Sequence, residues 1–171
     1  DSIKDNFLTP ALRSGKFLLN LINDILDMSQ IKEQKIRLVF QPADLKETIY
    51  NAVQLVELQA FKKGIRIITE IADDIPKKFC TDHNRFSQIL LNLLSNSIKF
   101  TNHGTITLKV ESCGNSDEIL ITVQDSGIGM TERDRRKLFN KYTHITPEGI
   151  EKINPNGAGL GLSIAYELAG L

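Results

Sequence analysis

Asn92, Asn96 and Lys99 bring two amides and an ammonium group to one side of a segment with helical periodicity. They stand at positions i, i+4 and i+7 beside a broad apolar arc, and Arg85 lies on the same stripe. An amide oxygen is a neutral ligand that Mg²⁺ accepts together with water and phosphate, and lysine is a point charge suited to phosphate. The stripe therefore fits Mg²⁺ with a triphosphate. A solvated helix face is the alternative, although asparagine is unfavourable inside a helix.

A second candidate for chemistry is Asp125, at the C-terminal end of a predicted strand. The sharp turn Ser126-Gly127-Ile128-Gly129 follows it directly. A carboxylate in this place can accept a hydrogen bond from an exocyclic amine such as that of adenine. An Asx-turn at the strand end is the alternative, and for an isolated aspartate it is the simpler interpretation.

Three glycines, Gly157, Gly159 and Gly161, precede a predicted helix. Glycine in such a place lets backbone N–H groups approach a phosphate at the helix N-terminus. The pattern is not a dinucleotide-binding fingerprint, because no strand precedes it, and not a P-loop, because no Gly-Lys-Ser/Thr follows. By itself it names no particular ligand.

The elements that must position these residues follow from local patterns. Asp44 and Glu47 form a capping box for a helix that Gly64 ends, and Asp82 caps the next helix. We expect strands at residues 36–40, 65–71, 78–81, 105–111 and 119–123, and helices at 45–63, 83–100, 131–139 and 161–168. Residues 143–158 are polar and aperiodic, and predict a loop. This order predicts an α/β (α+β) two-layer sandwich, with the helices on one face of a mixed sheet.

A long helix at residues 7–31 is expected before this sandwich. Its apolar face is wide, which suits a helix in a bundle. Thr9 as N-cap, with Pro10 at the first helical position, would start it there. A longer helix kinked at Pro10 is the alternative.

The composition restricts the class of protein. Lys and Arg number 21, as do Asp and Glu, so the net charge of zero gives no reason to expect nucleic acid or a membrane surface as partner. Cys80 and Cys113 are expected to be reduced thiols in a cytoplasmic protein. No apolar run approaches the ~20 residues of a membrane span. We therefore expect no direct membrane contact in this segment, although a longer parent protein could carry an anchor elsewhere.

Taken together, the motifs are specific. Residues 92–101, 125–129 and 157–162 closely resemble the N, G1 and G2 boxes of the ATP-binding domain of sensor histidine kinases, in the superfamily of gyrase, Hsp90 and MutL. Residues 82–90 resemble the lead-in to the N box and residues 138–142 the F box. Residues 18–27 resemble the second helix of the dimerisation and phosphotransfer domain of these kinases.

The resemblance implies a role for each residue. Asn96 would ligate Mg²⁺ with Asn92 beside it, Lys99 would face the phosphates, and these three would be the catalytic residues. Asp125 would bind the adenine amine. The further nucleotide contacts would be Gly127, Gly129, Phe139, Gly157, Gly159, Leu160, Gly161 and Leu162. Residues 143–156 would form the lid over ATP.

Asn92 matters for the reaction type. Related ATPases carry a glutamate there that activates water, and an asparagine cannot take the proton. The resemblance therefore favours transfer of the γ-phosphate to a protein histidine, for relay to a response-regulator aspartate, over hydrolysis. None of His83, His103 and His144 matches the acceptor motif of the family.

The expected domains are residues 1–33, the second helix of an incomplete dimerisation hairpin, and residues 34–171, the catalytic domain without its last strands. This segment alone is then expected to lack autokinase activity. The expected partners are a second copy, through the N-terminal helix, and a receiver domain. Three rival interpretations are a nucleotide-binding but inactive regulatory module, a hydrolytic ATPase and an interaction domain that binds no nucleotide.

Overall fold

The computed structural model describes residues 7–114, 118–136, 138 and 159–171, without the side chain of Arg13. The predicted lid, Phe139, Gly157 and His144 lie outside the described residues. The chain forms two compact units, one of residues 37–132 and one of residues 1–36 with 133–171. The predicted domain boundary at residues 33 and 34 stays a prediction.

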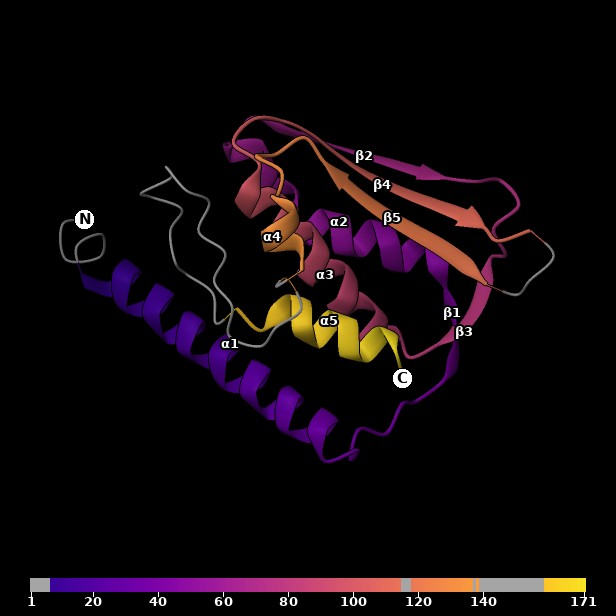
Figure 1. Ribbon diagram of the computed structural model, residues 1–171, viewed down its shortest axis with the longest axis horizontal. Coiled ribbons are helices and arrows are strands. Elements are labelled where there is room, and N and C mark those ends of the chain that lie inside the picture. The colour runs from indigo at the N-terminus through magenta and orange to yellow at the C-terminus, as the bar shows by residue number, and fades with distance from the viewer. Residues whose placement is uncertain (1–6, 115–117, 137, 139–158) are drawn as a thin grey trace. The chain divides into compact units, whose positions relative to one another are not determined.

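A three-stranded sheet with two helices on one face forms the core of the 37–132 unit (Figure 1). The strands are β2 (Ile65–Ile71), β4 (Gly104–Ser112) and β5 (Ile119–Asp125), and the helices are α2 (Leu45–Lys62) and α3 (His83–Phe100). β4 is parallel to β2 and antiparallel to β5, so the sheet is mixed. The predicted fold class and four of the five predicted strands are confirmed.

Alternation of side chains explains why these strands form one buried face. Ile106, Leu108 and Val110 are fully buried on β4, and the residues between them are more exposed. They pack with Ile49 of α2 and Leu94 of α3, which are also fully buried. Burying each such side chain contributes about 1.5–3 kcal/mol, so this layer fixes α3 against the sheet.

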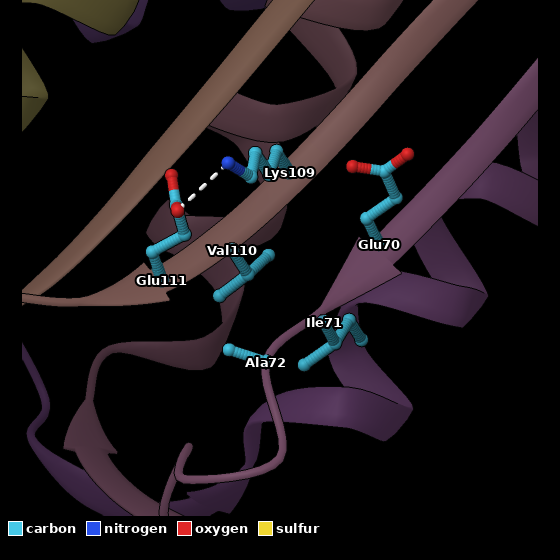
Figure 2. A pocket seen from close by; sticks show the side chains of 6 residues that line it. All are labelled: Glu70, Ile71, Ala72, Lys109, Val110 and Glu111. Carbon is cyan, nitrogen blue, oxygen red and sulfur yellow. Dashed lines mark ion pairs between the residues drawn. The ribbon is translucent and has the colours of Figure 1, made fainter.

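A shallow hollow of about 230 Å³ lies where β2 and β4 end. Its lining residues are Glu70, Ile71, Ala72, Lys109, Val110 and Glu111. Figure 2 shows Lys109 and Glu111 pointing toward each other, with Nζ and Oε1 2.8 Å apart. Both side chains are exposed, so solvent screens the pair and it adds little to stability. None of the predicted site residues lines this hollow.

The predicted strand at residues 36–40 is wrong. The strand is β1 (Gln41–Asp44), which pairs antiparallel with β3 (Lys78–Thr81) in a separate two-stranded sheet. Pro42 has no N–H, but it can stand in a strand with a partner on one side only. Residues 36–40 are instead held by a side chain, because the Val39 N–H donates to Asp82 Oδ2 at 2.9 Å.

The predicted helix at residues 131–139 is shorter in the structure, where α4 spans Glu132–Arg135. None of its residues is buried. Without an apolar face to pack, a single turn has little to extend it, because helix formation in isolation is unfavourable.

The second unit contains α1 (Thr9–Lys32) and α5 (Gly161–Ala169), which contact each other. The prediction of Thr9 as N-cap is wrong by one position. Leu8 is the cap residue and already has helical dihedrals, so Thr9 is inside the helix and Pro10 is in its first turn.

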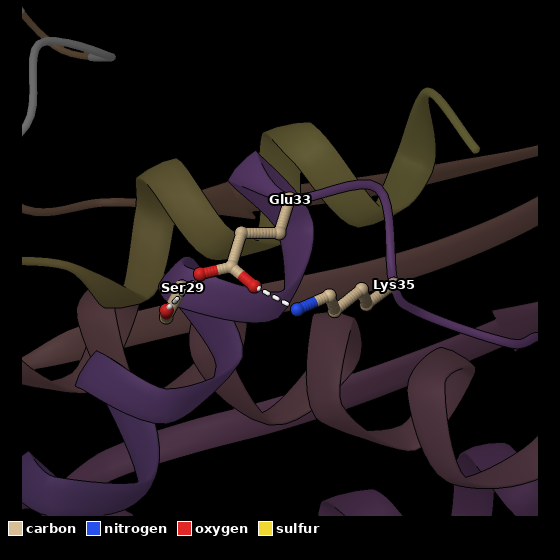
Figure 3. A network of polar contacts seen from close by, with 3 residues as sticks. All are labelled: Ser29, Glu33 and Lys35. Atoms are coloured by element: carbon tan, nitrogen blue, oxygen red, sulfur yellow. Dashed lines mark hydrogen bonds and ion pairs between the residues drawn. The ribbon is translucent and has the colours of Figure 1, made fainter.

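The end of α1 carries a small polar network (Figure 3). Ser29 Oγ donates to Glu33 Oε1 at 3.4 Å, and Lys35 Nζ lies 2.6 Å from Glu33 Oε2. Gln34 between them has a φ of 52°, which turns the chain out of the helix. Because these groups are exposed, the network shapes the helix end and adds little stability.

We predict that Thr101→Val stabilises the protein. Thr101 is fully buried, and its Oγ1 has no partner among the described residues. An unpaired buried hydroxyl costs about 1–3 kcal/mol, and valine has the same shape without it. The free energy of unfolding in urea should rise by about 1 kcal/mol.

Thr48→Val is the matched control. Thr48 is also buried, but its Oγ1 donates to the Asp44 carbonyl at 2.9 Å and lies 3.0 Å from His83 Nδ1. Its loss should cost about 1 kcal/mol. Equal destabilisation by both substitutions would mean that the Thr101 hydroxyl has a partner, such as buried water.

Candidate functional site

Asp82 fixes the start of α3, the helix that carries the polar stripe. Its Oδ1 accepts hydrogen bonds from the Asn84 and Arg85 N–H groups, both at 3.1 Å, and its Oδ2 accepts the Val39 N–H. The Val39 N–H, followed by those of Arg85 and Asn84, holds the pKa of this carboxyl below its ordinary value. The predicted N-cap is confirmed, and it also anchors the segment before β1.

The polar stripe consists of Asn92, Asn96 and Lys99, all half-buried on α3. On the inner side of the same helix Leu90, Leu94 and Ile98 are buried. Two amides and an ammonium group beside this apolar face add nothing to its packing. The structure therefore places the three residues on one helix face, as predicted.

Lys99 has a position suited to an anion. Its Nζ lies 5.2 Å from the ring centroid of Phe100, a cation–π distance. No carboxylate of the described residues forms an ion pair with it. Arg85, by contrast, donates through Nη1 to Gln88 Oε1 at 2.9 Å, so part of its guanidinium is engaged by a neighbour.

Asp125 is the last residue of β5 and forms the Asx-turn that the sequence left as an alternative. Its Oδ1 accepts the Gly127 N–H at 2.9 Å. A carboxylate has two oxygens, and no described residue bonds to Oδ2. The Asx-turn therefore orients the carboxylate and leaves one oxygen as a possible acceptor for an amine.

The turn after Asp125 is fixed on two sides. The Ser126 N–H donates to the Thr105 carbonyl at 3.0 Å, and the Thr105 N–H donates to Ser126 Oγ at 2.9 Å. On the other side the Ile128 N–H donates to the Phe100 carbonyl at 3.2 Å. A Cβ at Gly127 would lie 2.5 Å from that carbonyl oxygen, so only glycine fits. The turn is thus joined to the end of α3.

The third motif belongs to the other compact unit. Gly159 has a φ of 68°, Leu160 is buried, and Gly161 and Leu162 form the start of α5. The N-cap residue is Leu160, whose side chain has no acceptor for the first N–H groups of the helix. These N–H groups are oriented as an anion site requires.

Three contacts important for the site carry no signal in the sequence. Lys63 Nζ donates to the carbonyls of Ile98, Lys99 and Thr101. Ser126 holds the turn to β4, and His83 at the start of α3 is exposed while its Nδ1 lies 3.0 Å from Thr48 Oγ1. A lysine at a helix end predicts interaction with a helix dipole, but nothing indicates which helix.

The described part of the chain holds no cluster of three or more His, Cys, Asp or Glu side chains that could bind a metal ion. Cys80 and Cys113 are free and exposed. Among the described helices, none is both long and apolar enough to cross a membrane.

Residues 81–171 match the family described as histidine kinase-, DNA gyrase B- and HSP90-like ATPases. Over 171 residues the chain is 37% identical to the hybrid signal transduction histidine kinase B of Dictyostelium discoideum, covering 98% of this chain and 9% of the relative. It is 34% identical to the aerobic respiration control sensor protein ArcB of Escherichia coli K12, covering 97% of this chain and 21% of that protein. Full-length ShkA, solved with AMPPNP, superposes with a TM-score of 0.81 at 28% identity, covering 99% of this chain and 34% of ShkA.

The chain therefore belongs to the family of histidine kinase-, DNA gyrase B- and HSP90-like ATPases. The predicted resemblance to the ATP-binding domain of sensor histidine kinases is confirmed. The chain spans only a small part of these two kinases.

We predict that Asp82 makes stability depend on pH in the acid range. A carboxyl whose pKa is lowered on folding contributes fully above its ordinary value of 3.8. That contribution is lost as the pH falls through the lowered pKa of the folded state. Urea unfolding measured between about pH 6 and pH 3 should show this loss in the wild type.

Asp82→Asn keeps a cap acceptor without the charge, so its stability should fall less steeply with pH. Asp82→Ala should cost about 1 kcal/mol at neutral pH. Identical pH profiles for the wild type and Asp82→Asn would contradict the lowered pKa.

Proposed function

We propose that the chain is the ATP-binding catalytic portion of a sensor histidine kinase. It binds Mg²⁺–ATP, and in the full-length protein the γ-phosphate passes to a histidine outside this chain and then to a response-regulator aspartate. The observation that carries the proposal is the half-buried stripe of Asn92, Asn96 and Lys99 on the helix whose end is joined to the Asp125 turn. Membership of the ATPase family supports ATP as the nucleotide.

The residues of the stripe suit an Mg²⁺ ion whose other ligands are mainly phosphate oxygens. No carboxylate cluster among the described residues could form a protein cage for the ion. Mg²⁺ keeps several waters and phosphate oxygens when it binds a nucleotide, so one amide oxygen suffices as protein ligand. Asn96 would supply that oxygen, Asn92 would stand one turn away, and Lys99 would pair with the phosphates.

The adenine end would be bound by the turn. Oδ2 of Asp125 would accept the exocyclic amine, and Gly127 and Gly129 would form the wall beside the base. On the basis of the family resemblance, we propose further nucleotide contacts by Phe139, Gly157, Gly159, Leu160, Gly161 and Leu162. The position of Gly159 and Gly161 at the N-terminus of α5 supports a phosphate role for these two glycines.

Transfer is favoured over hydrolysis because Asn92 cannot act as a general base for water. The site would position the γ-phosphate and neutralise its charge, which is most of what phosphoryl transfer requires. Release of phosphate in the absence of any protein acceptor would favour a hydrolytic ATPase instead. Nucleotide binding without transfer in the intact protein would favour a regulatory module.

The test of the site is titration calorimetry with a non-hydrolysable ATP analogue, with and without Mg²⁺. We predict metal-dependent binding that Asp125→Asn weakens by about tenfold or more, because the amide offers a donor where the amine needs an acceptor. Asn96→Ala should lose the dependence on Mg²⁺. Asn102→Ala is the control, because it removes an asparagine at an exposed position after α3. Wild-type affinity in Asn96→Ala or Asp125→Asn would overturn the site.

We also propose that α1 pairs with a second copy of the chain. Large apolar side chains on this helix are exposed, among them Leu12, Phe17, Leu18, Leu19, Ile22, Ile25 and Leu26. Exposed apolar faces of this extent usually mark an interaction surface.

Sedimentation velocity should show a dimer that Ile22→Glu and Ile25→Glu together convert to monomer, because charges would be buried in the apolar contact. Lys16→Glu, on the same helix at an exposed polar position, should leave the dimer intact. A wild-type monomer at high concentration would contradict pairing through this helix.

A further inference from the structure

The C-terminal end of α3 leaves backbone carbonyls that need donors from outside the helix. Four consecutive carbonyls, those of residues 98–101, receive them from two sources. Lys63 Nζ lies 2.6 Å from the Ile98 oxygen and 3.2 Å from those of Lys99 and Thr101. The Phe100 oxygen accepts the Ile128 N–H.

Lys63 is well placed to hold this helix end. It is the C-cap residue of α2, and its own N–H donates to the Ala60 carbonyl at 3.0 Å. Gly64, with a φ of 68°, then turns the chain into β2. An ammonium group has three donors, which matches the three carbonyls, and its charge is favourable at the negative end of the α3 dipole.

The phosphate side and the adenine side of the proposed nucleotide site meet at this point. Lys99, whose carbonyl binds Lys63, carries the phosphate-facing ammonium. The Phe100 carbonyl, between two carbonyls held by Lys63, binds the turn that begins at Asp125. Any shift of the α3 end would therefore move the phosphate side and the adenine side relative to each other.

We propose that Lys63 is a positioning residue of the nucleotide site, acting through the α3 carbonyls without touching the ligand; this rests on the proposed function. Lys63 holds the last turn of α3, so that the distance between the stripe and the Asp125 turn stays constant. Polar groups aligned in advance bind a ligand without a further ordering cost, so loss of Lys63 weakens nucleotide binding.

The experiment compares the wild type with Lys63→Met, which keeps the length of the side chain but has no donor. Calorimetry with the non-hydrolysable ATP analogue and Mg²⁺ should show affinity about tenfold lower, because an α3 end without these donors has to be ordered when the nucleotide binds. Lys63→Gln, which keeps amide donors, should lie in between. Lys62→Met is the control, because Lys62 precedes Lys63 in the last turn of α2 and is exposed.

A second measurement separates positioning from general stability. Amide NMR spectra of the nucleotide-free proteins should show shifted Gly127 and Ile128 signals in both Lys63 variants and not in Lys62→Met. A purely structural lysine would lower the urea midpoint while leaving these signals and the affinity of the folded protein unchanged. If Lys63→Met does not fold, Lys63→Gln decides by the same two readouts.

The outcomes are distinguishable. Wild-type protein that binds no nucleotide overturns the proposed function and this proposal with it. Wild-type binding that a folded Lys63 variant matches, with unmoved Gly127 and Ile128 signals, overturns the role of Lys63 alone.

Discussion

Hydrogen bonding at the C-terminal end of α3 is the constraint on which the arrangement of the 37–132 unit depends. A helix end cannot be placed among other elements unless its last carbonyls find donors. Here the end of α2 supplies Lys63 and the turn after β5 supplies the Ile128 N–H. Two segments far apart in the sequence thus converge on one helix end. The residues with the clearest chemistry stand beside it, and that convergence keeps them in a defined place.

Apolar packing and the hydrogen bonds at the end of α3 contribute differently to the fold. The buried face of β4 against Ile49 and Leu94 supplies most of the free energy, because burial of such side chains is the largest favourable contribution to folding. It fixes the distance between α3 and the sheet, but apolar contacts are not directional. The register of α3 along its own axis is better set by hydrogen bonds to other segments at its two ends, from the Val39 N–H to Asp82 at the start and from Lys63 at the end.

The sequence predicted those parts of the structure that local patterns determine. Alternating apolar residues located β4 and β5, and the caps Asp44 and Asp82 located the starts of α2 and α3, because each signal acts within a few residues. The predicted strand at residues 36–40 was wrong because its formation depends on a distant partner. The segment is short and ends at Gln41-Pro42, but strand pairing is a long-range choice, and residues 78–81 pair with residues 41–44. Lys63 could not be recognised either, since its partners lie on another helix. The stripe was predictable because helical spacing alone brings its members together.

Charge balance explains why the stripe needs further groups if it is to hold a triphosphate. Lys99 offers a single positive charge, and the oxygens of Asn92 and Asn96 offer none. A triphosphate brings several negative charges, so most of the neutralisation must come from a metal ion and from backbone N–H groups such as those at a helix N-terminus. Amides beside one lysine are therefore suited to orienting a metal–nucleotide complex and poorly suited to binding the nucleotide alone. For that reason the dependence of binding on Mg²⁺ is more diagnostic of this site than affinity itself.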